Sequence, residues 1–213
     1  MTFEEINNNK AFITGKVIGE PEYSHEVMGE GFYNIQVEVK RLSEQCDLIP
    51  VTVSERLLFG FDTLDGAMVS ISGQFRSYNK LEDNKSRLIL TLFARELTEP
   101  DYSRNPNSIE ITGYVCKPPI YRVTPFKREI CDLLIAVNRA YNKSDYIPCI
   151  AWGRNARFAG NFAVGERVTV TGRIQSREYQ KTVDDETTTK IAYEVSVSKI
   201  NVNREGDGEP TQI

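Results

Sequence analysis

The segment Asp145–Gly153, which reads Asp-Tyr-Ile-Pro-Cys-Ile-Ala-Trp-Gly, carries two aromatic residues whose spacing suits stacking chemistry. Its strict alternation predicts a β-strand, because successive side chains of a strand take opposite faces. One face is a complete apolar row suited to a core: Ile147, Cys149 and Ala151. Tyr146, Ile150 and Trp152 take the other face, so the two rings exceed what core packing needs. At the rise of a strand the rings lie about 20 Å apart, which suits planar ligands such as two bases of an extended nucleic-acid strand.

A second alternating segment, residues 167–179, adds positive charge to this chemistry. Val168, Val170 and Ile174 take the face that suits a core. The opposite face presents, in order, Arg167, Thr169, Thr171, Arg173, Gln175, Arg177 and Tyr179. A cationic row with an aromatic residue is typical of a groove that follows a phosphodiester backbone and stacks its bases. An ordinary solvated face is the alternative, but arginine dominates the row and no acidic residue interrupts it.

The chain repeats itself at an offset of 98 residues. The Ile-Thr-Gly sequence at 13–15 recurs at 111–113, and the Asp-x-Ile-Pro sequence at 47–50 recurs at 145–148. Near the end of each copy the offset becomes 99, where Gly73 maps to Gly172. A register held over this length indicates a tandem duplication. The copies meet near residues 100–107, where Pro, Asp, Ser and Asn cluster.

Each copy is predicted to consist mostly of strands. In the second copy, apolar residues alternate around 109–115, 131–137, 146–152, 168–174 and 191–197, and Gly113 marks a bend or bulge. Residues 154–162 contain few β-branched side chains and predict a short helix. Five short strands with a helix after the third is the order of the OB-fold, a small Greek-key barrel. We therefore predict an all-β chain of two tandem OB-folds, at 1–100 and 107–203, joined by a linker at 101–106 and followed by a short acidic tail at 204–213.

Composition excludes several other classes of protein. No apolar run approaches membrane-spanning length and the acidic N-terminus lacks the regions of a signal peptide, so we expect a cytoplasmic protein. The four cysteines lack metal-ligand spacing and His25 is the only histidine, so we expect no metal and no other cofactor. Cys131 and Cys149 fall in apolar rows and are predicted core residues. A nuclease needs clustered carboxylates, whereas Asp132 and Asp145 are isolated, so we expect no enzymatic activity.

Several motifs of the second copy occur in order at a familiar spacing. They are Ile-Thr-Gly at 111–113, Leu-Ile-Ala-Val-Asn-Arg at 134–139, the segment 145–153, Gly-Glu-Arg-Val at 165–168 and Gly-Arg-Ile-Gln-Ser-Arg at 172–177. With these motifs, residues 107–203 resemble the bacterial single-stranded DNA-binding protein family. The resemblance implies a protein that coats and protects single-stranded DNA without sequence specificity, in replication, recombination or repair.

The resemblance also implies which side chains bind. The positions that match the family's base-stacking aromatics are Tyr141, Tyr146, Trp152 and Tyr179, and three of them are Tyr where the family often has Trp. Our candidates for phosphate contacts are Arg122, Lys127, Arg128, Arg139, Arg154, Arg157, Arg173 and Arg177. For Arg154 and Arg157, capping or solvating the predicted helix is the alternative.

The first copy has lost these features. At offset 98, Tyr141, Tyr146 and Trp152 become Ser43, Leu48 and Ser54. The first 106 residues hold 11 Lys and Arg against 17 Asp and Glu, whereas the remaining 107 hold 15 against 13. We therefore expect the second copy to carry most of the affinity, and the first to serve packing, assembly or an auxiliary contact. The residues that could still bind there in a different geometry are Arg76, Tyr78, Phe59 and Phe61.

Family members usually assemble four OB-folds, so the resemblance implies a homodimer of this two-copy chain. It also implies replication or recombination proteins as partners, although the tail lacks the family's acidic and hydrophobic tip. Divergence of the copies suits a phage or mobile-element version. The rival interpretation is an OB-fold protein-interaction module, such as a primosome-type accessory protein.

Overall fold

The computed structural model describes residues 7–61, 63–82, 85–183 and 186–203, so the predicted tail at 204–213 lies outside the described residues. The first copy contains β1 (Asn9–Val27), β2 (Glu30–Lys40), β3 (Cys46–Ser54), α1 (Glu55–Leu58), β4 (Met68–Glu82) and β5 (Lys85–Thr98). The second contains β6 (Asn107–Val115), β7 (Ile120–Val123), β8 (Glu129–Arg139), β9 (Lys143–Trp152), α2 (Arg154–Ala159), β10 (Arg167–Val183) and β11 (Glu186–Val202).

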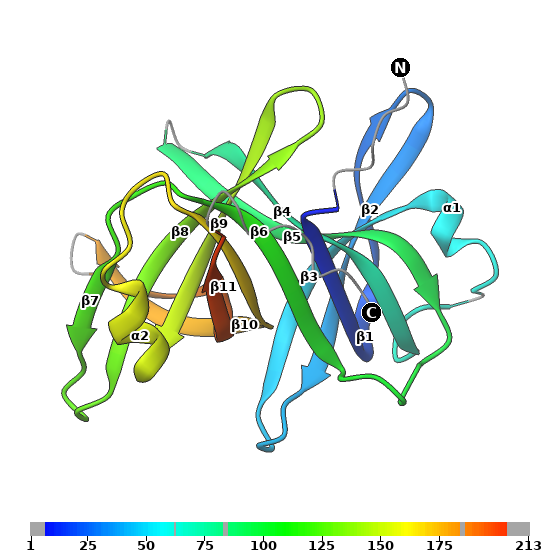
Figure 1. Ribbon diagram of the computed structural model, residues 1–213. Coiled ribbons are helices and arrows are strands. Elements are labelled where there is room, and N and C mark those ends of the chain that lie inside the picture. The colour runs from blue at the N-terminus through cyan, green and yellow to red at the C-terminus, as the bar shows by residue number, and fades with distance from the viewer. Residues whose placement is uncertain (1–6, 62, 83–84, 184–185, 204–213) are drawn as a thin grey trace, which may run out of the picture.

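Each copy forms a closed barrel of five strands (Figure 1). In the first, the order β2-β3-β5-β4-β1 closes through the pairing of β1 with β2. In the second, β8-β9-β11-β10-β6 closes through the pairing of β6 with β8. A short helix follows the third barrel strand in both, as α1 follows β3 and α2 follows β9. The prediction of an all-β chain with two OB-folds is confirmed. None of the helices in the described ranges is long and apolar enough to cross a membrane.

Two local features differ from the predictions. The short strand β7 was not predicted; it pairs with β8 outside the barrel. Of the bend or bulge predicted at Gly113, the bulge is absent, because β6 and β10 stay in register through this residue. A Cβ at Gly113 would lie 2.4 Å from the carbonyl oxygen of Ala136 on β8. The residue must be glycine because β6 approaches β8 there to close the barrel.

The predicted core rows are buried in both barrels. Ile147, Cys149 and Ala151 are at most 2% exposed, and Val168 and Ile174 are fully buried. The first copy keeps the same row on β3, where Ile49, Val51 and Val53 are also fully buried. The duplication therefore preserves the interior while it changes the outer face.

The four cysteines differ in access to solvent, which gives a first testable prediction. Cys46 is exposed, Cys116 is partly buried and burial raises its pKa, and Cys131 and Cys149 are buried. Burial raises the pKa of Cys131 to about 11 and also raises the pKa of Cys149. The thiolate is the reactive form, so we expect Cys46 to label rapidly with a disulfide reagent, and Cys131 and Cys149 only after unfolding. Cys46→Ser should abolish the rapid phase; a rapid phase that survives this substitution would contradict the assignment.

The barrels join through an antiparallel pairing of β1 with β6, which Figure 1 shows running side by side. Its central pair is Ala11 with Ile109, and Asn9 and Ile13 pair with Ile111 and Asn107. These partners exchange under the 98-residue repeat, because Ala11 maps to Ile109 and Asn9 to Asn107. The pairing therefore has an internal two-fold symmetry.

Two buried aspartates, one from each copy, extend this seam. Asp47 on β3 accepts a hydrogen bond from the backbone N–H of Ser176 on β10, at 2.8 Å. Asp145 on β9 accepts one from the backbone N–H of Ser77 on β4, at 2.7 Å. Both aspartates are fully buried. These bonds attach β3 of the first barrel to β10 of the second, and β9 of the second barrel to β4 of the first.

Candidate nucleic-acid interface

Two of the predicted stacking residues stand on β9 of the second barrel. Tyr146 and Trp152 are 44% and 39% exposed. Ile150, predicted to share their face, is buried, and so is Ile130, which pairs with Trp152 across β8 and β9. The two half-exposed rings therefore flank a buried apolar floor, and the rings themselves are the faces on which bases can stack.

Tyr141 lies in the turn between β8 and β9, where it is 83% exposed. Its φ is +62° and that of Asn142 is +54°. Positive φ is common for Asn but uncommon for a bulky aromatic residue. Such backbone strain concentrates at functional sites. Tyr179 is 37% exposed on the part of β10 that pairs with β11 beyond the barrel.

The cationic candidates divide by their partners. Arg139 on β8 contacts buried Asp145 at 3.2 Å, and Arg173 on β10 contacts buried Asp47 at 3.0 Å. As predicted, the cationic row on one face of residues 167–179 contains no acidic residue. The acidic partners Asp145 and Asp47 lie on other strands, and Asp47 belongs to the other copy. Burial, then the neighbouring Arg41, lowers the pKa of Arg173. Arg139 and Arg173 are therefore committed in part to the seam.

Other cations remain available to a ligand. Arg122 pairs with Asp132 at 2.7 Å and Arg177 approaches Glu194 at 3.7 Å, in both cases with the arginine more than half exposed. The Arg122–Asp132 pair is exposed, and such pairs contribute only about 0–1 kcal/mol, so a phosphate can replace Asp132 at little cost. Glu194 is buried, so this argument does not extend to Arg177. Within the described ranges, the structure shows no ion pair for exposed Lys127, Arg128 or Arg154.

A structural role on the helix, which was the alternative to phosphate binding for Arg154 and Arg157, fits Arg157 better than Arg154. Arg157 on α2 pairs with Glu129 at 2.7 Å, and the same carboxylate accepts a hydrogen bond from the hydroxyl of Tyr121. This arrangement ties α2 to β8. Arg154, at the start of α2, lies two residues beyond Trp152 and is exposed.

Register places the remaining cations beside the tryptophan. Arg122 on β7 pairs with Ile130 on β8, which in turn pairs with Trp152 on β9. Arg122 and Trp152 are therefore two strand spacings, about 10 Å, apart. Lys127 and Arg128 occupy the turn of the same β7–β8 hairpin. The stacking surface has cations along one border.

The outer face of the first barrel carries an aromatic cluster that we did not predict. The rings of His25 and Phe32 stack at 5.1 Å, and Phe32 lies 5.7 Å from Phe93. The guanidinium of Arg76 lies 4.0 Å above Phe93, and that of Arg95 lies 6.0 Å from it. The only signal of this cluster in the sequence is Phe93, an aromatic residue in an outward position between buried Leu92 and Ala94. Phe93 does not match any of the family's stacking positions, so the resemblance does not identify it. Phe59 is 80% exposed.

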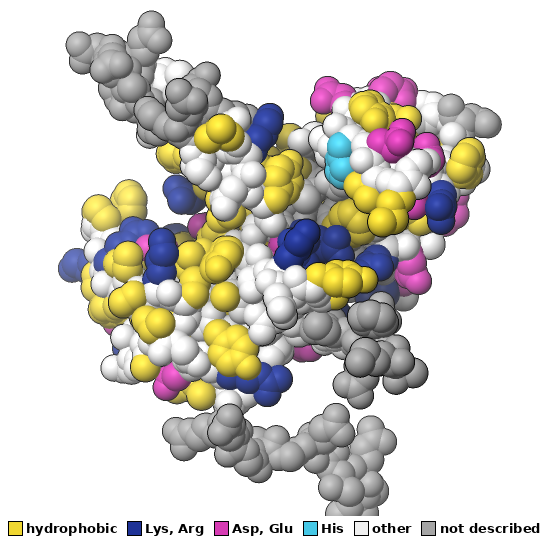
Figure 2. Space-filling view, turned by 90° about the horizontal axis from the view of Figure 1, so that it is seen from above, with side chains coloured by type: hydrophobic (Ala, Val, Ile, Leu, Met, Phe, Trp, Pro, Cys, Tyr) yellow, Lys and Arg dark blue, Asp and Glu magenta, His cyan; other side chains and the backbone are white. Residues whose placement is uncertain are grey.

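Charge is distributed unevenly over the two barrels. Figure 2 views the molecule from above the view of Figure 1, with Asp and Glu gathered mainly over the first barrel on the right. Within the described residues, no group of three or more His, Cys, Asp and Glu side chains could hold a metal ion. The arrangement offers stacking and ionic contacts to a ligand.

A model of the single-strand binding protein family matches residues 106–203, the whole of the second barrel. Over these residues the chain is similar to this family. The predicted resemblance over 107–203 is confirmed. The chain is 33% identical over 81 residues to single-stranded DNA-binding protein 3 of Streptococcus agalactiae, and 32% identical over 81 residues to single-stranded DNA-binding protein 1 of Staphylococcus aureus. Each match covers 35% of this chain, and 59% and 48% of those relatives.

A likeness to a solved structure extends over both barrels. The single-stranded DNA-binding protein of Thermus aquaticus superposes with a TM-score of 0.73, covering 94% of this chain and 95% of that one at 17% identity. A deletion mutant of the same protein gives a TM-score of 0.69 at 18% identity. At these identities the likeness establishes the two-barrel fold alone. The sequence match to the single-strand binding family thus lies in the second barrel, and both barrels share the fold of the solved structure.

Proposed function

We propose that this protein binds single-stranded DNA without sequence specificity, and that it acts by binding and not by catalysis. The observation that carries the proposal is the pair of half-exposed rings, Tyr146 and Trp152, on either side of a buried apolar floor. Bases of a single strand unstack from one another and restack on Tyr141, Tyr146, Trp152 and Tyr179. Every base has a π face, so such stacking tolerates any sequence.

The phosphates of the strand would contact the cations that border this surface. The strongest candidates are the ones without a buried acidic partner: Arg122, Lys127, Arg128 and Arg154. Arg177 approaches buried Glu194 but is itself more than half exposed, so it stays a candidate. Duplex DNA should bind weakly, because its bases are already stacked on one another. The family match of residues 106–203 supports this proposal over a protein-interaction module.

Titration with oligo(dT) tests the proposal through intrinsic fluorescence, because Trp152 is the only tryptophan. We expect strong quenching that duplex DNA of the same length does not produce. Four neutralised phosphates would give a slope of about −3 in a plot of log affinity against log salt concentration. A Phe59→Ala variant should titrate like the parent. Unchanged fluorescence at micromolar protein would reject the stacking site and favour an interaction module.

Several broader assignments follow from the proposal. We propose roles in replication, recombination or repair, a cytoplasmic location, and a homodimer that brings four barrels together. The domain division at 1–100, 101–106 and 107–203 is likewise proposed; β5 ends at Thr98 and β6 begins at Asn107. A phage or mobile-element origin stays a prediction from the divergence of the copies.

A further inference from the structure

A groove of about 730 Å³ lies where the tip of the β8–β9 hairpin meets the first barrel. Arg76 and Arg95 line it from β4 and β5, and Arg139, Tyr141 and Lys143 line it from the second barrel. We call it the junction groove. Figure 2 looks down on the side of the molecule from which the β8–β9 tip projects, and Lys and Arg side chains gather near its middle. Tyr141 thus belongs both to the proposed stacking set and to this groove.

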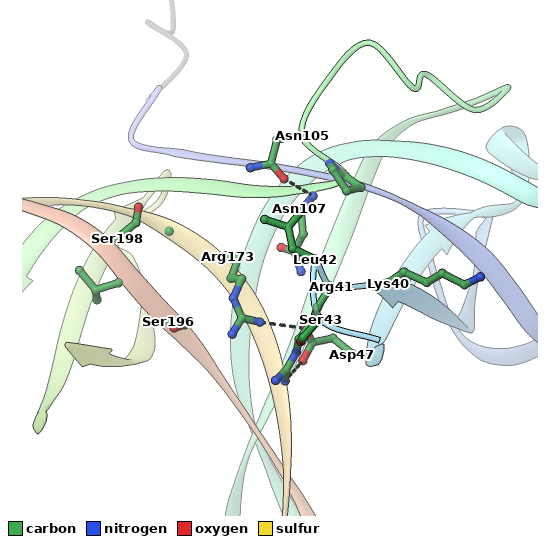
Figure 3. Close-up of a pocket in the computed structure, with 13 residues that line it drawn as sticks. Lys40, Arg41, Leu42, Ser43, Asp47, Asn105, Asn107, Arg173, Ser196 and Ser198 are labelled. Carbon is green, nitrogen blue, oxygen red and sulfur yellow. Dashed lines mark hydrogen bonds and ion pairs between the residues drawn. The ribbon is translucent and has the colours of Figure 1, made fainter. Parts of the chain in front are cut away.

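The internal symmetry of the chain supplies a second pocket for comparison, of about 790 Å³ (Figure 3). In it, Arg41 and Arg173 both contact the carboxylate of Asp47, at 2.5 and 3.0 Å. The two guanidinium charges are used to balance one buried acid inside the protein. Of the three cations that line this pocket, Lys40 alone is left to add free charge, because Arg41 and Arg173 both contact Asp47.

The junction groove is not balanced in this way. Gln74 stands at the repeat position of Arg173, so among the residues that the structure describes, buried Asp145 has Arg139 alone as its ion-pair partner, at 3.2 Å. Arg76 turns instead to Gln74, at 2.7 Å, and to the ring of Phe93. Within the described residues, no ion pair is formed by Arg95 or Lys143, both of which are exposed.

The groove therefore holds four cationic side chains against one carboxylate. Burial, and then the neighbouring Arg139 and Arg95, lowers the pKa of Arg76 to about 10. Crowding of like charges in a partly buried site is relieved when an anion binds between them. A phosphodiester has the charge and the acceptor oxygens that guanidinium groups recognise.

The aromatic cluster of the first barrel continues from the groove. Phe93 lies under Arg76, and Phe32 and His25 follow it across the outer face. The second barrel has no equivalent of this combination at the corresponding positions. Arg76 pairs with Thr91 across β4 and β5, and at the equivalent place the second barrel has a buried hydrogen-bonded pair, Gln175 with Glu194. The first barrel has its own combination of positive charge and rings.

We propose that the junction groove binds a phosphodiester of the strand that stacks on the second barrel, and directs it onto Phe93 and Phe32 of the first barrel. The inference rests on the proposed function and extends it. The first copy then contributes directly to binding, through a geometry different from that of the second copy.

Oligo(dT) of two lengths tests the inference with the full chain. A strand of roughly 8 nucleotides fits one barrel and a strand of roughly 30 spans both, since one OB-fold covers about 4–16 nucleotides. In the double variant Arg95→Gln/Lys143→Gln, we expect affinity for the long strand to fall about 10-fold or more, and affinity for the short strand to change less than about 2-fold. The salt slope for the long strand should become shallower by about 1.4. Phe93→Ala should weaken the long strand selectively.

Lys16→Gln/Lys40→Gln is the matched control, because it removes the same charge from exposed lysines outside the groove. Equal losses in the two double variants would overturn the inference, as would parent-like binding of the long strand by Arg95→Gln/Lys143→Gln. If the groove instead docks an acidic protein segment, the parent would bind an oligoglutamate peptide, the groove variant would not, and oligo(dT) affinity would stay unchanged. Trp152 quenching by the short strand distinguishes failure of this inference from failure of the proposed function.

Discussion

Trp152→Ala is expected to weaken binding of oligo(dT) by about 5- to 150-fold, since one base stack contributes about 1–3 kcal/mol. The indole is the largest exposed ring on the apolar floor, and Arg122 on the neighbouring hairpin is placed to hold the adjoining phosphate. Tyr146→Ala should act in the same direction. The double variant should lose less than the product of the two effects if one strand bridges both rings. Fluorescence anisotropy of labelled oligo(dT) measures all three.

Phe59→Ala in the first barrel is the control for ring removal. Phe59 is 80% exposed and lies beyond the end of α1, outside both the stacking surface and the junction groove. It should bind oligo(dT) like the parent. Equal losses for Phe59→Ala and Trp152→Ala would remove the basis for placing the main site on the second barrel.

Asp47→Ala is expected to produce the largest loss of stability among single substitutions at charged residues. The carboxylate is fully buried and receives Arg41, Arg173 and the backbone N–H of Ser176 from the other barrel. Removing one member of a buried ion-pair network costs about 3–5 kcal/mol, because Arg41 and Arg173 lose their partner while they stay partly desolvated. For a chain of this size the loss corresponds to a fall in Tm of roughly 6–20 °C.

Asp132→Asn provides a matched control by thermal unfolding. Asp132 also pairs with an arginine, Arg122 at 2.7 Å, but both side chains are substantially exposed. Its loss should cost less than about 1 kcal/mol. If Asp47→Ala unfolds at the temperature of Asp132→Asn, the seam does not depend on its buried carboxylate.

The repeat and the alternation of apolar residues predict most of the fold. Alternation is a pattern between residues two positions apart, and the repeat keeps a nearly constant offset of 98 residues, so both can be recognised in the sequence. The predicted strands at 146–152 and 168–174 lie within β9 and β10. The predicted helix corresponds to α2, which follows the third barrel strand of its copy. Strand β7 was missed because its four residues, Ile120–Val123, are all exposed and show no alternation.

The site was less predictable, because its electrostatics join residues far apart in the chain. Arg173 reads as a free cation in its strand, yet its partner Asp47 lies 126 residues away in the other copy. Phe93 becomes part of a cluster only when β2 and β5 place it beside Phe32 and β4 places Arg76 above it. No periodicity in the sequence encodes such contacts.

Because β1 and β6 belong to one chain, the pairing of the two barrels does not depend on protein concentration, and each half can change alone. A dimer of identical barrels would present the same face twice, and a bound strand could run across it in two equivalent directions. Here Trp152 stands where the first barrel has Ser54, and the two faces are chemically different. A strand that touches both faces has its 5′ and 3′ ends distinguished. If a strand binds across both faces as proposed, we expect the internal pairing to give it a defined polarity relative to the protein.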